Sequence, residues 1–260
     1  MKKTTTIAAV LLLNAFICFP ADGNRLKTPE LVKKFTVKII GEIPHHINSF
    51  TQGLLYYDDM LYESTGLRGK STVQKINVRT GAVIKILRIP EVFAEGLARW
   101  DNRLIQLTWK DRIAFVYDIS NFSKIDVFRY ETQGWGLTSD NHHLIMSDGS
   151  DKLYFRNPDS FAVEKVINVR FYEKPLDLIN ELEYANQFIY ANVWHEKFLV
   201  QIDPEDGTVV GQIDCLPLFQ QLPPLGFESV LNGIAYNETT KTFYLTGKNW
   251  PKIFEVVLIP

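Results

Sequence analysis

The side chains best suited to catalysis or ligand binding lie in a short motif that the chain repeats five times. In each copy a polar or aromatic residue opens an apolar strand, and in three copies another such residue closes the strand that follows. The first set contains Gln52, Glu95, Trp135, Asn180, Glu181 and Asn232, and the second contains Trp109, Trp194 and Lys248. Indole walls with a few polar groups are typical of pockets for small or peptide ligands, and a carboxyl group in such a pocket can transfer a proton.

The strands that must position these residues form hairpins. Each copy runs through a short apolar strand into a polar turn, such as Asp58-Asp59, and then into a second strand. In an antiparallel hairpin the start of the first strand lies beside the end of the second, so Glu95 neighbours Trp109 and Asn180 neighbours Trp194. We therefore expect all nine side chains to meet at one end of the fold.

A turn rich in Asn, Asp, Pro and Gly recurs at the same spacing as the motif, after the third strand of four units. Residues 33–260 thus divide into five units of about 46 residues with four strands each, the length of a propeller blade. The sequence predicts an all-β protein, a five-bladed β-propeller. The last unit shows only three strands, so the strand from Phe35 to Ile40 is expected to complete it and close the ring. The segment from Leu216 to Val230 breaks the rhythm and is expected to lie over one mouth of the channel, with a short helical turn.

Composition excludes several classes of protein. With 46% hydrophobic residues in 260, the chain can bury a sizeable core, which excludes a disordered protein. The 28 basic and 30 acidic side chains leave a formal charge of -2, which gives no uniform field for nucleic acid or anionic lipid. We expect no nucleic-acid partner, no membrane-spanning segment in the mature chain, and a monomer.

The first 21 residues are typical of an export signal. Positive charge at the N-terminus precedes an apolar run from Ile7 to Phe19, followed by Pro20-Ala21-Asp22. The mature protein is therefore expected in the periplasm or outside the cell, with Cys215 as its one thiol. Cys18 is an alternative lipoprotein anchor, but the bulky Phe16 and Ile17 disfavour acylation there.

Metal-binding patterns are weak in this sequence. His45 and His46 are adjacent and would point to opposite faces of a strand, so one metal ion cannot easily bind both. His195 has no Cys or carboxylate at the spacing of zinc ligands. We predict no catalytic metal and no required cofactor, and a structural calcium ion in the channel stays open.

The repeated motifs also carry a resemblance that covers about Phe35 to Pro260. The runs are Phe50-Thr-Gln-Gly-Leu, Glu63-Ser-Thr-Gly, Glu95-Gly-Leu, Gly134-Trp-Gly-Leu, Ser147-Asp-Gly, Asn180-Glu-Leu-Glu, Ala191-Asn-Val-Trp, Leu231-Asn-Gly-Ile-Ala and Thr246-Gly-Lys-Asn-Trp-Pro-Lys. With these runs the sequence resembles the glutamine cyclotransferases, the glutaminyl cyclases of plant and bacterial type. The resemblance implies a five-bladed propeller that converts an N-terminal glutaminyl residue of a peptide or protein into pyroglutamate and releases ammonia.

The resemblance also suggests roles for individual residues. Glu95 is the candidate proton carrier, since an amide nitrogen leaves only when it is protonated. Lys248, or the amides of Asn180 and Gln52, are candidates to stabilise the oxyanion. The residues of the mouth that are expected to bind substrate are Gln52, Trp109, Trp135, Trp194, Glu181 and Asn232. One departure is Gln133, where the family often carries an acidic residue.

Two other functions compete with the cyclase. One is a non-enzymatic exported propeller that binds peptides or a protein partner on the same aromatic mouth. The other is a metal-dependent propeller hydrolase, which requires inward carboxylate or amide ligands around an ion on the axis. Release of ammonia from a glutamine peptide distinguishes the cyclase from both.

Overall fold

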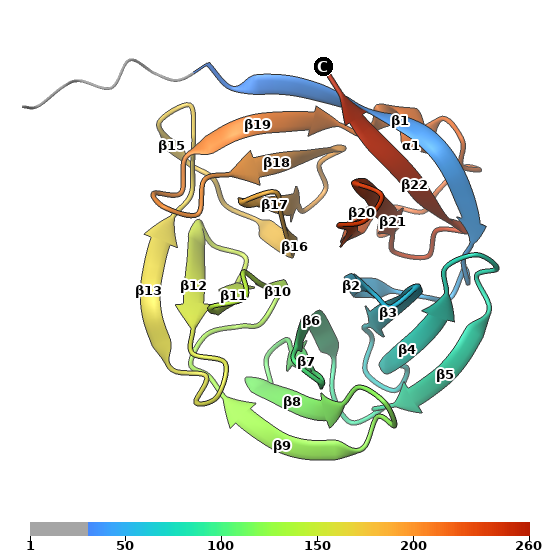
Figure 1. The fold of residues 1–260 in the computed structure, drawn as a ribbon, viewed down its shortest axis with the longest axis vertical. Coiled ribbons are helices and arrows are strands. Elements are labelled where there is room, and N and C mark those ends of the chain that lie inside the picture. Colours follow the sequence, from blue (N-terminus) through green and yellow to red (C-terminus); the bar gives the residue numbers. More distant parts are fainter. Residues whose placement is uncertain (1–30) are drawn as a thin grey trace, which may run out of the picture. The chain divides into compact units, whose positions relative to one another are not determined.

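The computed structural model describes residues 31–260, which form one compact unit. The export signal predicted for residues 1–21, with Cys18, lies outside this part of the chain. Strands arranged as five blades surround a central axis (Figure 1). Every strand pairing within a blade is antiparallel. The predicted five-bladed propeller is confirmed.

Each blade begins with its innermost strand, except that the outermost strand of blade five comes from the start of the chain. The strands are β2 (Thr51–Tyr57), β3 (Met60–Thr65), β4 (Thr72–Asn77) and β5 (Val83–Arg88) in blade one; β6 (Ala94–Trp100), β7 (Arg103–Thr108), β8 (Ile113–Asp118) and β9 (Lys124–Arg129) in blade two; β10 (Leu137–Ser139), β11 (Leu144–Ser147), β12 (Lys152–Arg156) and β13 (Val163–Asn168) in blade three; β16 (Ile179–Ala185), β17 (Phe188–Val193), β18 (Phe198–Ile202) and β19 (Val209–Asp214) in blade four; and β20 (Leu231–Asn237), β21 (Thr242–Gly247), β22 (Lys252–Ile259) and β1 (Lys33–Pro44) in blade five.

Strand β1 closes the ring, as the sequence predicts. It pairs antiparallel with β22 from Thr36 to Pro44, with a register shift between Ile39 and Gly41. Its first residues also pair in parallel with β19, from Lys33 to Thr36. Blades four and five therefore share one eight-stranded sheet, which the sequence repeat did not indicate.

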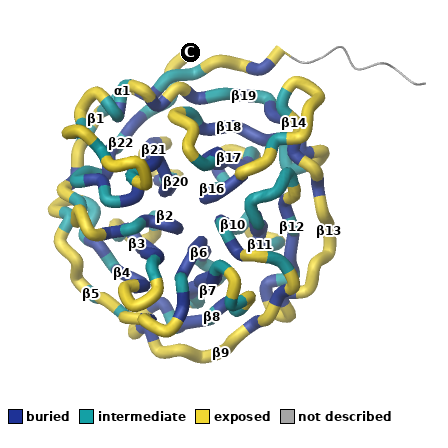
Figure 2. Tube along the Cα trace, turned by 180° about the vertical axis from the view of Figure 1, so that it is seen from behind, coloured by how far each residue is buried: buried dark blue, intermediate teal, exposed yellow. Residues whose placement is uncertain are grey.

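The core lies between the blades. Inner strands are buried and outer strands are largely exposed (Figure 2). Five clusters of buried apolar residues each join two neighbouring blades. Representative pairs are Leu55 with Leu97, Leu107 with Leu137, Ile145 with Leu182, Leu199 with Leu245, and Ala235 with Leu61. Because no blade has a core of its own, the whole ring is needed to bury them.

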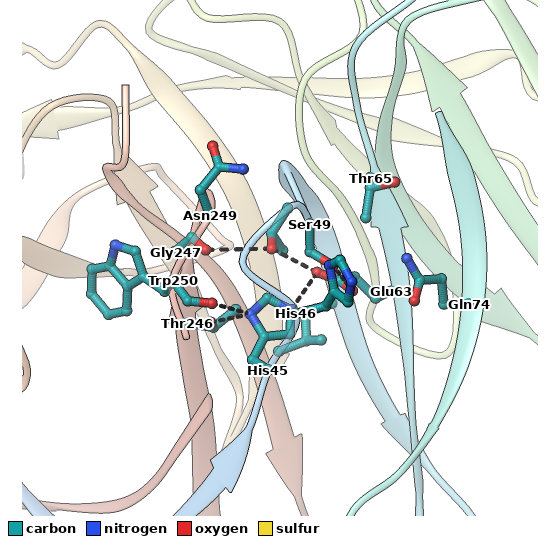
Figure 3. A network of polar contacts seen from close by, with 12 residues as sticks. His45, His46, Ser49, Glu63, Thr65, Gln74, Thr246, Gly247, Asn249 and Trp250 are labelled. Atoms are coloured by element: carbon teal, nitrogen blue, oxygen red, sulfur yellow. Dashed lines mark hydrogen bonds and ion pairs between the residues drawn. The ribbon is translucent and has the colours of Figure 1, made fainter. Parts of the chain in front are cut away.

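A polar network reinforces the junction of blades five and one (Figure 3). His45, just after β1, has Nδ1 2.8 Å from the carbonyl oxygen of Trp250 and Nε2 2.9 Å from a carboxylate oxygen of Glu63. Ser49 and Thr51 donate hydrogen bonds to the same carboxylate. The buried Glu63 thus links the residue that follows the closing strand to blade one.

Two segments depart from the four-stranded rhythm. A small hairpin of β14 (Arg170–Phe171) and β15 (Lys174–Pro175) precedes blade four. The segment between blades four and five contains the predicted helical turn, α1 (Leu216–Phe219). No helix among residues 31–260 has the length and hydropathy needed to cross a membrane.

Candidate active site

A pocket opens at the end of the propeller where the inner strands begin. Its volume is about 340 Å³, within the range of sites for small ligands. The residues that line it come from all five blades and from the segment before blade five: Phe50, Gln52, Leu67, Phe93, Glu95, Trp109, Trp135, Asn180, Trp194, Glu228 and Lys248. The structure therefore brings together seven of the nine residues that the sequence placed at this mouth.

Register shifts in the inner strands place the polar side chains. Four of the five inner strands shift register against their neighbour, and the shifts fall at Gln52, Glu95, Asn180 and Asn232. A bulge of this kind bends the strand locally and redirects a side chain that would otherwise follow the alternation of the strand. This explains why the repeated motif places a polar side chain at the same end of the ring in each of these blades.

The glycine of the repeated motif allows neighbouring inner strands to approach closely. A Cβ on Gly96 would lie 2.5 Å from the backbone nitrogen of Leu137 in the next blade, far closer than two such atoms can be. In blade four the register equates Leu182 with Leu97, so Glu181 occupies the glycine position.

Glu181 and Asn232 do not line the pocket, which differs from our expectation. The Glu181 carboxylate accepts hydrogen bonds from the backbone nitrogens of Leu54 at 3.1 Å and Ile234 at 2.8 Å, so it links three inner strands. The Asn232 amide donates to the Thr51 carbonyl at 2.9 Å and to Gln52 Oε1 at 3.2 Å. Asn232 therefore positions the pocket residue Gln52, whereas Glu181 holds the inner strands together.

Glu95 and Lys248 are the two buried ionisable groups of the pocket. Burial raises the pKa of the Glu95 carboxyl well above its usual range, although the Lys248 charge and a hydrogen bond from Gln52 act in the opposite direction. Burial also lowers the pKa of Lys248, while Glu95 and Glu228 oppose that shift. Because Asn232 occupies the amide oxygen of Gln52, its NH₂ group is left to donate to Glu95. A buried carboxyl group whose pKa is raised in this way is suited to carry a proton.

Aromatic rings form most of the remaining wall. Phe93 contacts Phe50 with ring centroids 6.2 Å apart and Trp109 at 5.6 Å. Across the pocket, Trp135 and Trp194 meet edge to face at 5.9 Å. The Lys248 ammonium lies over Phe50, 4.7 Å from its centroid.

Gln133 joins the two halves of this wall. Its Oε1 accepts hydrogen bonds from the indole nitrogens of Trp109 at 2.5 Å and Trp135 at 3.3 Å. The neutral residue at this position thus fixes two indoles without adding charge to the mouth.

Two polar atoms in the pocket wall lack a hydrogen-bond partner. They are Oδ1 of Asn180 and Nε1 of Trp194, and both are buried. The backbone of Asn180 is fixed, since Ser147 Oγ donates to its carbonyl at 2.7 Å. An unpaired buried acceptor and an unpaired buried donor are costly unless a ligand satisfies them. The pocket is therefore suited to a ligand that both donates and accepts hydrogen bonds.

Comparison with known proteins identifies the family. The sequence profile described as "Glutamine cyclotransferase" matches residues 10–258, nearly the whole chain. The chain belongs to the glutamine cyclotransferase family. It is 39% identical over 227 residues to a glutaminyl-peptide cyclotransferase of Arabidopsis thaliana, covering 85% of this chain and 71% of that protein. The fold also matches the crystal structure of Myxococcus xanthus glutaminyl cyclase with a TM-score of 0.84 and 39% identity, covering 87% of this chain and 98% of that one.

In this member of the cyclotransferase family, four pocket residues were not predicted from the sequence: Phe50, Leu67, Phe93 and Glu228. Phe50 and Phe93 each stand two residues before a predicted site residue, Gln52 and Glu95, and that spacing was an available signal. Glu228 had none, because it comes from the segment that lies outside the repeat. Within residues 31–260, no three His, Cys, Asp or Glu side chains gather as metal ligands.

Proposed function

We propose that this chain is a glutaminyl-peptide cyclotransferase, which converts an N-terminal glutaminyl residue into pyroglutamate and releases ammonia. Family membership supports the reaction. The observation that carries it to this pocket is Glu95, a buried carboxyl of raised pKa among aromatic walls and close to unpaired hydrogen-bonding atoms.

The reaction is an intramolecular attack. The α-amine nitrogen bonds to the side-chain amide carbon of the same residue and forms a tetrahedral oxyanion. An N-terminal amine has a reference pKa of about 7.7 to 8.0, so an appreciable fraction is neutral near physiological pH. Glu95 accepts the proton that the attacking amine loses and delivers it to the amide nitrogen. The carbon–nitrogen bond then breaks and ammonia leaves.

The other polar groups hold charge and orientation. The Lys248 ammonium is positioned in the same wall to stabilise the oxyanion, and the unpaired Trp194 Nε1 is a second donor. The unpaired Asn180 Oδ1 accepts a hydrogen bond from the substrate's amine or amide. These assignments give each unpaired atom a partner when substrate is bound.

The indoles and phenylalanines confine the substrate. A glutaminyl side chain must fold back on its own amine before the five-membered ring can close. A narrow aromatic pocket restricts the extended conformers and excludes water, which lowers the entropic part of the barrier. The faces of Trp109 and Trp135 also suit a cationic amine before it loses its proton.

The same proposal covers the setting of the reaction. The apolar N-terminal segment supports export to the periplasm or the medium, where peptides and proteins with N-terminal glutamine are the substrates. We further propose that the chain works as a monomer and needs no cofactor, because every group used in the steps above is supplied by its own side chains.

Ammonia release tests the proposal. The full chain is incubated with a peptide headed by glutamine, with the same peptide acetylated on its α-amine, and with a peptide headed by asparagine. We expect one equivalent of ammonia and of pyroglutamyl peptide from the first only. Binding of the glutamine peptide without ammonia release would instead favour the non-enzymatic propeller.

A further inference from the structure

A row of aromatic rings leaves the pocket over its rim at blade four. The ring of His195 lies 4.4 Å from the nearer ring of Trp194, a pocket residue. The ring of Phe227 lies 4.8 Å from that of His195. We call His195 and Phe227 the aromatic ledge. Phe227 is 80% exposed, second only to Leu31 among the large apolar side chains of residues 31–260.

A second cavity begins at the ledge. It has a volume of about 580 Å³ and is lined by His195 and Phe227, by the charged pair Glu196 and Lys197, and by the proline-rich part of the segment between blades four and five. The two cavities are lined by residues that are adjacent in sequence. Trp194 and Glu228 line the pocket, and their chain neighbours His195 and Phe227 line the second cavity. The aromatic ledge therefore separates two adjoining cavities, the smaller of which holds Glu95.

The peptide chain of a bound substrate must extend out of the pocket across its rim. An N-terminal glutaminyl residue is joined through its carbonyl carbon to the rest of the peptide, so the second residue has to cross the rim. At Trp109 the rim presents charge, because the Lys110 ammonium lies 3.9 Å from the centroid of that indole. At Trp194 the rim presents the two rings of the aromatic ledge, with an open cavity behind them.

We propose that the aromatic ledge binds the side chain of the residue that follows the glutamine, and that the second cavity receives the peptide beyond it. Preferred substrates then carry an aromatic or large aliphatic residue at their second position. This inference rests on the proposed cyclase function and deepens it. Burial of Phe227 against such a side chain removes apolar surface of both partners from water. Edge-to-face or offset contacts with the two rings add to that gain.

Matched peptides test the inference. The substrates are tripeptide amides Gln-X-Ala with Gly, Phe, Leu, Lys or Glu at X, and the measurement is kcat/KM for ammonia release. The proteins are the full chain and its Phe227→Ala, His195→Ala and Tyr172→Ala variants. Tyr172 is a matched control, because it is an exposed aromatic residue that lines neither cavity.

In the unmodified chain we expect Phe and Leu at X to exceed Gly by about 2- to 10-fold in kcat/KM, from an aromatic contact for Phe and from partial burial of apolar surface for Leu. Phe227→Ala should reduce that ratio toward one, His195→Ala should reduce it in part, and Tyr172→Ala should keep it. A ratio near one in the unmodified chain, or a ratio that survives Phe227→Ala, overturns the inference while the cyclase function stands. Failure to cyclise any of the five peptides would instead count against the proposed function.

Discussion

The imidazole of His45 and the carboxylate of Glu63 lie in contact at 2.9 Å where the first strand of the chain meets blade one. The other ring nitrogen of His45 faces the backbone carbonyl of Trp250 at 2.8 Å. Both nitrogens therefore oppose acceptors, which favours the doubly protonated ring. Burial alone lowers the pKa of His45, but the charge of Glu63 and the hydrogen bonds from the ring outweigh it, and the pKa is raised.

This pair makes stability depend on pH. A group whose pKa is raised on folding contributes fully below its unfolded value of about 6.5, and its contribution is lost as pH rises through the folded value. We expect the unmodified chain to exceed His45→Gln in free energy of unfolding by about 2 kcal/mol below pH 6.5. The advantage should shrink steadily at higher pH. Denaturant unfolding from pH 6 to 9 measures it, and a gap that is constant or grows with pH would rule out a charged His45.

Ring closure by β1 predicts a sharp contrast between two substitutions in one strand. Val37 is buried between blades four and five, whereas Ile40 is half exposed. Val37→Asp places an unpaired charge in the core and should cost about 3 to 5 kcal/mol. Ile40→Asp should cost about 0.5 kcal/mol, as surface substitutions do. Equal melting temperatures for the two variants would mean that β1 does not seal the ring in solution.

The sequence predicted the ring because its signals are local. The sequence shows directly the apolar strands, the polar turns and the motif that recurs five times. The missing strand of the last unit pointed to Phe35 as the start of the closing strand. Contacts between blades left no such signal. A Cβ on Gly53 would lie 2.5 Å from the backbone nitrogen of Leu97, in another blade. Only the structure shows that contact.

In the pocket, too, contacts within a hairpin could be predicted from the sequence, whereas contacts between blades could not. Hairpin geometry placed Glu95 beside Trp109 and Asn180 beside Trp194 correctly, since both pairs follow from strand order. It could not show that Glu181 reaches Leu54 in blade one and Ile234 in blade five, because that direction depends on a bulge and on how the three blades pack. Glu228 was out of reach for a similar reason: its place depends on how an irregular segment folds over the mouth.

Gln133 should act on substrate binding. Gln133→Leu keeps much of the side chain's size but removes the oxygen that accepts from Trp109 and Trp135. Two lost hydrogen bonds of about 0.5 to 1.5 kcal/mol each should loosen the indoles and raise KM about 3- to 10-fold, with a smaller change in kcat. Steady-state kinetics on a glutamine peptide separate the two constants. An unchanged KM would show that the indoles hold their positions without Gln133.

Metal removal should leave turnover intact. The proposed proton transfer uses the carboxyl group of Glu95, and the attacking amine needs no metal hydroxide. We expect dialysis against EDTA to change kcat by less than about two-fold, a minor effect on the scale of metal catalysis. A melting curve recorded on the same sample would reveal a structural calcium ion. Loss of turnover without unfolding, restored by zinc, would contradict this mechanism.

The kcat of Glu95→Gln on a glutamine peptide tests directly whether Glu95 carries the proton. The amide retains the shape of the carboxyl group but cannot carry the proton from the amine to the leaving nitrogen. We predict a loss of about 10²- to 10⁴-fold in kcat with little change in KM, and an unchanged melting temperature. Glu91→Gln, an exposed position that does not line the pocket, is the matched control and should retain full activity. A Glu95→Gln variant with a kcat close to that of the unmodified chain would show that another group carries the proton.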